Sequence, residues 1–236
     1  MKKIFLILAI AVAAISCSDD NDAASNKTLL KSAKIINATQ QEFNYSFEYD
    51  NKQRISTMKL TGINNQNFDF TYFSDGRIQT ITINETATEA ATLVYEFTYD
   101  SKKKLNGFYR NEEFTEVIEE TPNYYTYGNG SYFELNEFGD LIAYDGGHTM
   151  EYDTTKNGPM ADVNTNCGML SRFIGVNIRY LLTHKALTAR KRSDLTLDDR
   201  LENIYNTEGY ITSFEKYNID NVKNMTGTFQ YLTPEK

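Results

Sequence analysis

The chain has 236 residues, a formal net charge of −8 at pH 7, two cysteines, two histidines and no tryptophan. Nucleic acid is disfavoured as a partner, because an acidic chain lacks the basic face that releases counterions from phosphate backbones. Two cysteines exclude a disulfide framework, and the length suits a single large all-β domain.

The first 16 residues predict an export signal. Lys2 and Lys3 precede an apolar run over residues 4–15, which is too short to span a bilayer and is typical of a secretory signal peptide. Residues 14–17, Ala-Ile-Ser-Cys, resemble a bacterial lipobox, which is cleaved before its cysteine. The resemblance implies that Cys17 becomes a lipidated N-terminus that anchors the protein to a membrane. Loss of the two lysines would take the net charge from −8 to −10.

The segment after Cys17 is acidic. Ser18, Asp19, Asp20 and Asp22 resemble the tract that sends Bacteroidota lipoproteins to the outer face of the outer membrane. The resemblance implies a lipid-anchored protein that faces the cell exterior. The composition also fits an acidic, solvated tether over residues 17–30, and both interpretations can hold together. Residues 31–236 then form a single domain.

A repeated hairpin pattern predicts the fold of this domain. Alternating aromatic residues precede a polar turn, and an aliphatic residue then begins the return strand, with another apolar residue three places later. Alternation indicates antiparallel strands with one buried and one wet face, and Asp75-Gly76 between such strands is a strong hairpin signal. The five aliphatic residues that begin return strands are Ile55, Ile78, Leu105, Leu141 and Ile211.

The spacing of three after each turn breaks the two-residue period of a strand. Five copies of the break predict a repeated bulge that bends the sheet. We therefore expect a mainly β fold, a strongly curved antiparallel meander of hairpins that forms a barrel or half-barrel. Its expected core includes Phe43, Phe47, Phe70, Phe97, Ile55, Ile78, Leu105 and Ile211.

The long gap between Leu141 and Ile211 contains a different pattern. Apolar residues at helical spacing predict one amphipathic helix near residues 168–185 that caps or plugs the sheet, with His184 at its C-terminal end. A basic cluster follows it, and nearby aspartates could neutralise this cluster; a phosphate or headgroup site is the alternative. The residues are Lys185, Arg190, Lys191 and Arg192 on one side and Asp194, Asp198 and Asp199 on the other.

Short motifs resemble a known family. Tyr49-Asp50 and Tyr99-Asp100 are similar to the YD-type hairpins of Bacteroidota lipoproteins, and residues 152–160 are similar to a segment of the uncharacterised DUF4595-type family. Gly158 is inserted in that segment, and Met160 replaces an aromatic residue. The resemblance implies a porin-like antiparallel barrel and implies no activity.

The chain contains none of the common metalloprotease, serine hydrolase or phosphate-binding motifs, and we expect neither a cofactor nor a metal site. His148 and His184 are too few to build a metal centre without several carboxylates. Cys167, next to Gly168 and an apolar stretch, is expected to be a packed residue rather than a reactive thiol. A carboxylate pair for glycoside cleavage stays open, because the sequence fixes no separation between acids.

Tyr124, Tyr125, Tyr127 and Tyr132 are the candidate ligand-binding residues. Adjacent Tyr124 and Tyr125 should point to opposite faces of a strand, so one ring can stack on a sugar unless both pack under the helix. Three functions follow. The favoured one is a non-enzymatic structural or assembly component of the envelope with a protein partner; the second is a surface module that binds a glycan or peptide; the third is a glycoside-active enzyme.

Overall fold

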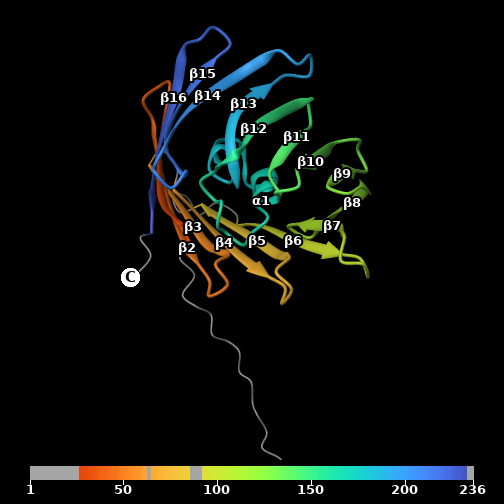
Figure 1. Ribbon diagram of the computed structural model, residues 1–236. Helices are drawn as coiled ribbons and strands as arrows, with labels where there is room; N and C mark the ends of the chain where they lie inside the picture. The colour runs from red at the N-terminus through yellow and green to blue at the C-terminus, as the bar shows by residue number, and fades with distance from the viewer. Residues whose placement is uncertain (1–26, 63–64, 86–91, 233–236) are drawn as a thin grey trace, which may run out of the picture.

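The computed structural model describes residues 27–62, 65–85 and 92–232, which form a closed antiparallel barrel around a short helix (Figure 1). Each strand pairs with its neighbours in the chain, and β1 pairs with β16 to close the ring. The strands are β1 (Leu30–Asn37), β2 (Glu42–Tyr49), β3 (Ile55–Gly62), β4 (Gln66–Tyr72), β5 (Ile78–Glu85), β6 (Leu93–Tyr99), β7 (Leu105–Arg110), β8 (Glu113–Thr121), β9 (Tyr124–Tyr127), β10 (Tyr132–Leu135), β11 (Leu141–Tyr144), β12 (His148–Asn157), β13 (Lys185–Lys191), β14 (Leu197–Tyr205), β15 (Ile211–Asn218) and β16 (Lys223–Tyr231).

The predicted bulges occur directly after the turns. In the β2–β3 hairpin, for example, Tyr49 pairs with Ile55 but Glu48 pairs with Thr57, so one residue of β3 is extra. Register shifts occur at the same place in the four hairpins whose return strands begin with Ile78, Leu105, Leu141 and Ile211. Because the extra residue restores parity, both apolar residues of each copy point inward and are buried. All eight core residues expected from the sequence are buried.

Tyrosine hydroxyls reinforce the bulged hairpins. Tyr49, the last residue of β2, donates to the main-chain carbonyl of Leu30, the first residue of β1, at 2.7 Å. The same bond joins a tyrosine to the first residue of the preceding strand in four further places, which are Tyr72 to Ile55, Tyr99 to Ile78, Tyr152 to Leu141 and Tyr231 to Ile211. Each bond satisfies a carbonyl at a strand start, where the bulge disturbs the regular ladder.

The barrel wall is apolar inside and polar outside. Phe68 and Phe133 point inward and are almost fully buried, whereas Glu48, Asp69 and Thr71 on β2 and β4 are exposed. Membrane-spanning barrels have the reverse arrangement, with an apolar band outside. The outer face of β2 and β4 is therefore polar, and the apolar interior is a packed core.

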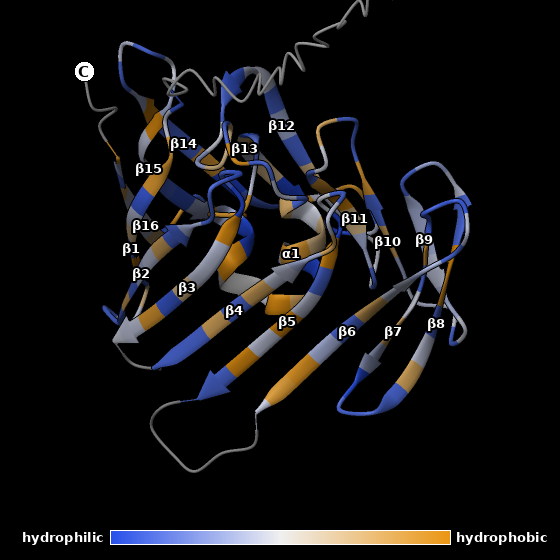
Figure 2. Ribbon diagram, turned by 90° about the horizontal axis from the view of Figure 1, so that it is seen from below, coloured by the Kyte–Doolittle hydropathy of each residue, from blue (hydrophilic) through white to orange (hydrophobic). Residues whose placement is uncertain are grey.

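The predicted helix is a plug inside the barrel, but its predicted extent is wrong. Helix α1 (Cys167–Ile174) is capped by the Asn166 side chain, which accepts from the main-chain N–H of Met169 at 2.9 Å. Gly175, with φ at +128°, ends α1, and a separate 3₁₀ helix, η1 (Val176–Tyr180), follows it. His184 consequently lies in the loop before β13 and does not end a helix. Figure 2 shows α1 enclosed by the ring of strands.

The plug approaches the wall most closely at the β10–β11 turn. The main-chain N–H of Gly168 donates to the carbonyl of Gly139 at 2.8 Å, and a Cβ atom on Gly168 would lie only 2.4 Å from that oxygen. On the other side of α1, the Phe173 ring packs edge-on against Phe97 and Phe108, with centroids 4.8 and 5.0 Å apart. Glycine and aromatic contacts together hold α1 in the barrel.

The predicted signal peptide, the lipidated Cys17 and the acidic tract with Ser18, Asp19, Asp20 and Asp22 lie outside the described residues. The described chain begins at Lys27, whose ammonium donates to the Asn164 side chain at 3.3 Å. None of the helices in the described part of the chain is long and apolar enough to cross a membrane.

Candidate functional site

The four candidate tyrosines divide between the two faces of the wall. Tyr125 points inward and stacks on Phe133, with ring centroids 4.5 Å apart, and Tyr127 is also inside, below Arg172. Tyr124 and Tyr132 lie together on the outer face, 5.6 Å apart. The adjacent pair Tyr124 and Tyr125 therefore points in opposite directions, and the four residues do not form one site.

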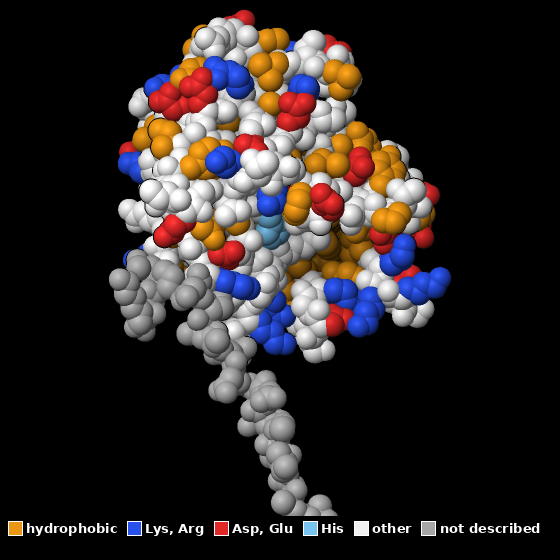
Figure 3. Space-filling model, viewed as in Figure 1, with side chains coloured by type: hydrophobic (Ala, Val, Ile, Leu, Met, Phe, Trp, Pro, Cys, Tyr) orange, Lys and Arg blue, Asp and Glu red, His pale blue; other side chains and the backbone are white. Residues whose placement is uncertain are grey.

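Tyr125 lines a pocket of about 740 Å³ at the end of the barrel that carries the β2–β3, β4–β5 and β6–β7 turns; we call it the mouth pocket. Its apolar floor includes Ile78, Leu105 and Met169 of α1, together with the rings of Tyr99 and Tyr125. Ser74, Asn164 and Asn166 add neutral polar groups, and the cationic residues of its lining are Lys52, Arg54, Arg77, Lys103 and Lys104. Figure 3 shows Lys and Arg side chains below a hollow with hydrophobic walls at this end.

The local structure of the turns positions these cations. In the β2–β3 turn, the Asp50 carboxylate accepts from the main-chain N–H groups of Lys52 and Arg54, and its other oxygen binds the Arg54 guanidinium. The guanidinium then lies over the Tyr72 ring, 4.3 Å from its centroid. Arg77 lies over Tyr99 at the same distance in the next hairpin. In the β2–β3 hairpin, Asp50 of the Tyr-Asp pair thus both shapes the turn and orients a cation at the mouth.

The charges around the mouth pocket do not cancel. Five cationic side chains line it against two acidic ones, Asp75 and Glu119, and a third acid, Asp50, pairs with Arg54 in the β2–β3 turn. Asp75 is held by Arg77 and also by Lys103, and their hydrogen bonds lower the pKa of the carboxyl to about 2; Glu119 lies 3.3 Å from the Lys104 ammonium. Lys52 has no carboxylate partner among the described residues and donates weakly to the carbonyl of Ser74. The pocket is a cationic region in a chain of net charge −8.

These groups suit binding rather than acid–base catalysis. Both acids of the lining are paired with cations, Asp75 with Arg77 and Glu119 with Lys104, so neither is a free carboxylate. Burial, and then the charge of Glu119, raise the pKa of Tyr125 to about 12, so its hydroxyl remains a donor. In the part of the chain that the structure describes, no cluster of three His, Cys, Asp or Glu side chains could hold a metal ion.

A buried polar cluster beside the plug was not foreseen from the sequence. Asp140 is fully buried and accepts from the main-chain N–H groups of His184 and Lys185 at 2.6 and 3.0 Å. The His184 ring places one nitrogen 3.4 Å from the Asp140 carboxylate and the other 3.2 Å from the carbonyl of Val163. Burial opposes charge on this ring, but Cys167 and Asp140 outweigh it and raise the pKa of His184 to about 11.

This cluster has a structural role. A charged His184 can donate from both ring nitrogens and so joins the β10–β11 turn to the segment before α1. Cys167 is a free thiol that is completely buried, in agreement with the predicted packed residue.

Three of the four cations of the basic cluster after the plug are paired with acidic neighbours, as one of the two interpretations predicted, and Lys185 lies over the Phe138 ring instead. The Arg190 guanidinium lies 2.5 Å from Asp198 and 2.7 Å from Asp199, and Arg192 lies 3.1 Å from Asp198. Lys191 pairs with Glu151 on β12. These partners leave little free charge for a phosphate or headgroup.

No family model and no curated protein matches the chain. Among solved structures, it is similar to a porin-like protein from Bacteroides vulgatus, at 10% identity over 87% of this chain and 99% of the other, with a TM-score of 0.44. A porin-like protein from Bacteroides uniformis is 11% identical over 86% and 98% of the two chains, with a TM-score of 0.40. The closed barrel described above rests on the strand pairing of this chain and not on these similarities.

Proposed function

We propose that this chain is a lipid-anchored protein of the bacterial outer surface that binds an acidic saccharide in the mouth pocket. The observation that carries the proposal is the excess of cations, five against three acids when Asp50 is counted, around a large pocket of an acidic chain. Carboxylate or sulfate groups of a sugar chain would pair with Lys52, Lys103 and Arg77. This is the binding-module alternative of the sequence interpretation, extended to a class of ligand.

The neutral groups of the pocket support a sugar rather than a simple anion. Tyr125 contacts Phe133 with one face of its ring, and it lines the pocket, where a pyranose can stack on it. Ser74, Asn164 and Asn166 offer donors and acceptors to hydroxyl groups. Cationic, aromatic and amide groups in one pocket match the charged, flat and hydroxylated parts of an acidic saccharide.

The proposed anchor would keep this pocket near the membrane. Lys27 contacts Asn164, which itself lines the mouth pocket, so the chain enters the barrel at the same end. Lys27 lies ten positions after Cys17 in the chain, a span of at most about 35 Å when fully extended. Lipidation of Cys17 and sorting by Ser18, Asp19, Asp20 and Asp22 remain part of the proposal, supported by the resemblances in the sequence.

Calorimetric titration with trigalacturonate tests the proposal, and neutral trigalactose is the ligand control. We expect Lys52→Gln combined with Lys103→Gln to weaken trigalacturonate binding about tenfold or more, which is about 1.4 kcal/mol. The matched control, Lys34→Gln with Lys223→Gln, removes the same charge from the outer wall and should change affinity less than about twofold.

Two further results would complete this test. Tyr125→Leu should weaken binding without any change in charge, as expected for loss of a stacking platform. The proposal is wrong if the native protein binds no acidic saccharide, or if the two double variants lose affinity equally.

A further inference from the structure

Apolar side chains are exposed together on the outer face of β7 and β8. Tyr109 and Phe114 are directly paired across these strands, with ring centroids 5.1 Å apart, and they are 39% and 52% exposed. Ile118, further along β8, is 46% exposed. Phe114 also covers Gly107, where a Cβ atom would lie 2.5 Å from the ring, so the absence of a side chain there lets the ring lie against the sheet. Tyr124 and Tyr132 extend the same outer face onto β9 and β10.

Acidic side chains lie among these apolar residues. Glu96 pairs with Tyr109 across β6 and β7, and Glu116 pairs with Gly107 across β7 and β8. Glu120 follows two residues after Ile118 on β8 and accepts from the Thr126 hydroxyl at 3.1 Å. All three are exposed, and none forms an ion pair with another described residue. We call this surface, with Tyr109, Phe114 and Ile118, the acidic apolar face.

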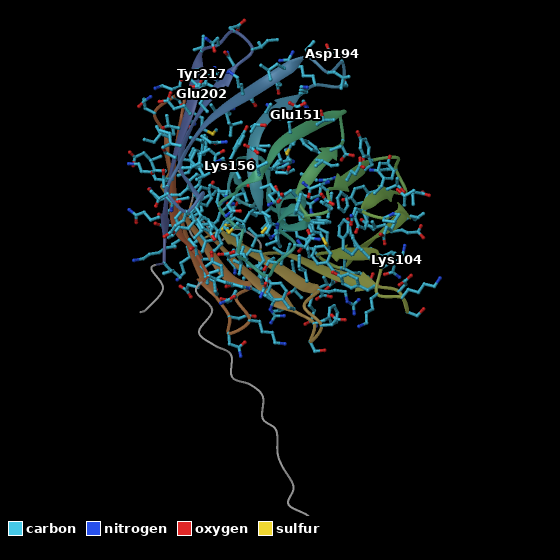
Figure 4. All side chains as sticks on the ribbon, in the orientation of Figure 1. Lys104, Glu151, Lys156, Asp194, Glu202 and Tyr217 are labelled. Carbon is cyan, nitrogen blue, oxygen red and sulfur yellow. The ribbon has the colours of Figure 1, made fainter. Side chains whose placement is uncertain are left out.

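On the opposite part of the outer wall, the acidic side chains are paired with cations. Glu48 on β2 lies 3.0 Å from the Lys59 ammonium, and Glu215 on β15 lies 3.0 Å from that of Lys223. Glu42, Glu151 and Glu202 are likewise paired with Lys34, Lys191 and Arg200. Figure 4 labels Glu151 and Glu202 on this part of the wall. Cations on the same or the neighbouring strand therefore compensate these outward glutamates of β2, β12, β14 and β15, whereas Glu96, Glu116 and Glu120 on β6 and β8 lack such cations.

A groove of about 530 Å³ runs into the acidic apolar face. Val94, Glu96, Tyr109, Asn111 and Glu112 line it, so an aliphatic wall meets two carboxylates. A lysine or arginine side chain combines these properties, because its stem is apolar and its end is charged. The groove thus has the chemistry to receive a long cationic side chain.

We propose that the acidic apolar face is a docking surface for a second protein that presents Lys or Arg around an apolar side chain. Charge complementarity identifies this occupant. Unpaired carboxylates resist desolvation unless cations meet them, and exposed aromatic residues supply the apolar centre of an interface. A symmetric contact between two copies would place these acids against each other, because the same patch serves both subunits. The inference does not depend on the mouth pocket.

A short fluorescent peptide of alternating Lys and Leu is the probe, and its binding is followed by anisotropy. Substituting Glu96→Gln, Glu116→Gln and Glu120→Gln together should weaken binding about tenfold or more. The matched control substitutes Glu48→Gln, Glu151→Gln and Glu215→Gln, which changes the net charge equally on the compensated wall. We expect that control to bind within about twofold of the native protein.

Two further measurements test whether binding needs the apolar side chains of the face and the cations of the peptide. Phe114→Ser with Ile118→Ser should weaken binding although every carboxylate remains, and a peptide with Gln in place of Lys should not bind. Equal loss in the two triple variants, or no binding by the native protein, would overturn the proposal. Concentration-dependent self-association that disappears in the Glu96, Glu116 and Glu120 variant would assign the face to a second copy and overturn it as well.

Discussion

The inner and outer faces of the barrel wall use aromatic side chains for different purposes. Inside, Phe97 and Phe108 are buried and meet the plug through Phe173. Outside, Tyr109 and Phe114 contact each other but remain largely exposed. The same period-two pattern produces both sets, so alternation locates strands but does not separate residues that stabilise the fold from those free to bind. The predictions below test this separation.

The largest difference is expected between Phe97→Ala and Phe114→Ala. Phe97 is 3% exposed, so its truncation should lower the free energy of unfolding by about 3 to 5 kcal/mol. Phe114→Ala should cost about 0.5 kcal/mol or less, because the ring faces water. Denaturant unfolding measures both losses in the free energy of unfolding. Similar losses would show that aromatic residues on the outer face stabilise the fold as much as those inside.

His184→Gln should lower stability by about 1.5 to 3 kcal/mol near pH 6, because it removes the cationic ring that lies 3.4 Å from the buried Asp140 carboxylate. The native pKa of about 11 lies above the unfolded value of about 6.5, so the folded protein binds the proton more tightly. The contribution is complete below pH 6.5 and is lost as pH rises toward 11.

Unfolding at pH 6, 8 and 10 should therefore show a shrinking difference between the native protein and His184→Gln. His148→Gln is the control, since His148 stacks on Tyr144 near the opposite end of β11. A difference that stays constant with pH would contradict the charged state of His184.

Gly168→Ala should cost about 1 to 3 kcal/mol, because the added methyl group would meet the carbonyl of Gly139 in the β10–β11 turn. Gly128→Ala is matched to it, since a Cβ atom there meets nothing within 4 Å. Thermal unfolding of the two variants should differ accordingly. If both melt like the native protein, the plug is not seated as closely as described.

Tyr152→Phe should cost about 0.5 to 1.5 kcal/mol, because it deletes the hydroxyl that donates to the carbonyl of Leu141. Tyr217→Phe, which loses only a bond to Glu215 on the outer wall (Figure 4), should have a smaller effect. Equal stability of the two variants would argue against the tyrosine bonds as a structural device.

Local patterns in the sequence predicted the hairpins, their bulges and the buried residues such as Ile55 and Met58. The helix was predicted too long, because Leu181 and Leu182 continue the apolar spacing although Gly175 has already ended α1. These two leucines are buried by the surrounding barrel and not by a helix. Tertiary packing here overrides the periodic pattern.

The candidate site was only partly predictable. Tyr125 was one of four candidate ligand-binding residues and lines the mouth pocket, and its binding role stays a prediction. Lys52, Arg77 and Lys104 come from three separate turns, and only the curvature of the barrel brings them to one opening. Similarly, His184 and Asp140 are 44 residues apart in the chain, and no local pattern marks their contact.

Hydrogen–deuterium exchange with and without trigalacturonate tests the central claim most directly, because it locates the ligand on the folded chain. We predict slower exchange in the turns at residues 50–54, 74–77 and 100–104, which surround the mouth pocket, and unchanged exchange in β7 and β8 away from those turns. Protection confined to other parts of the barrel, or no protection at saturating ligand, would contradict a saccharide site at the mouth.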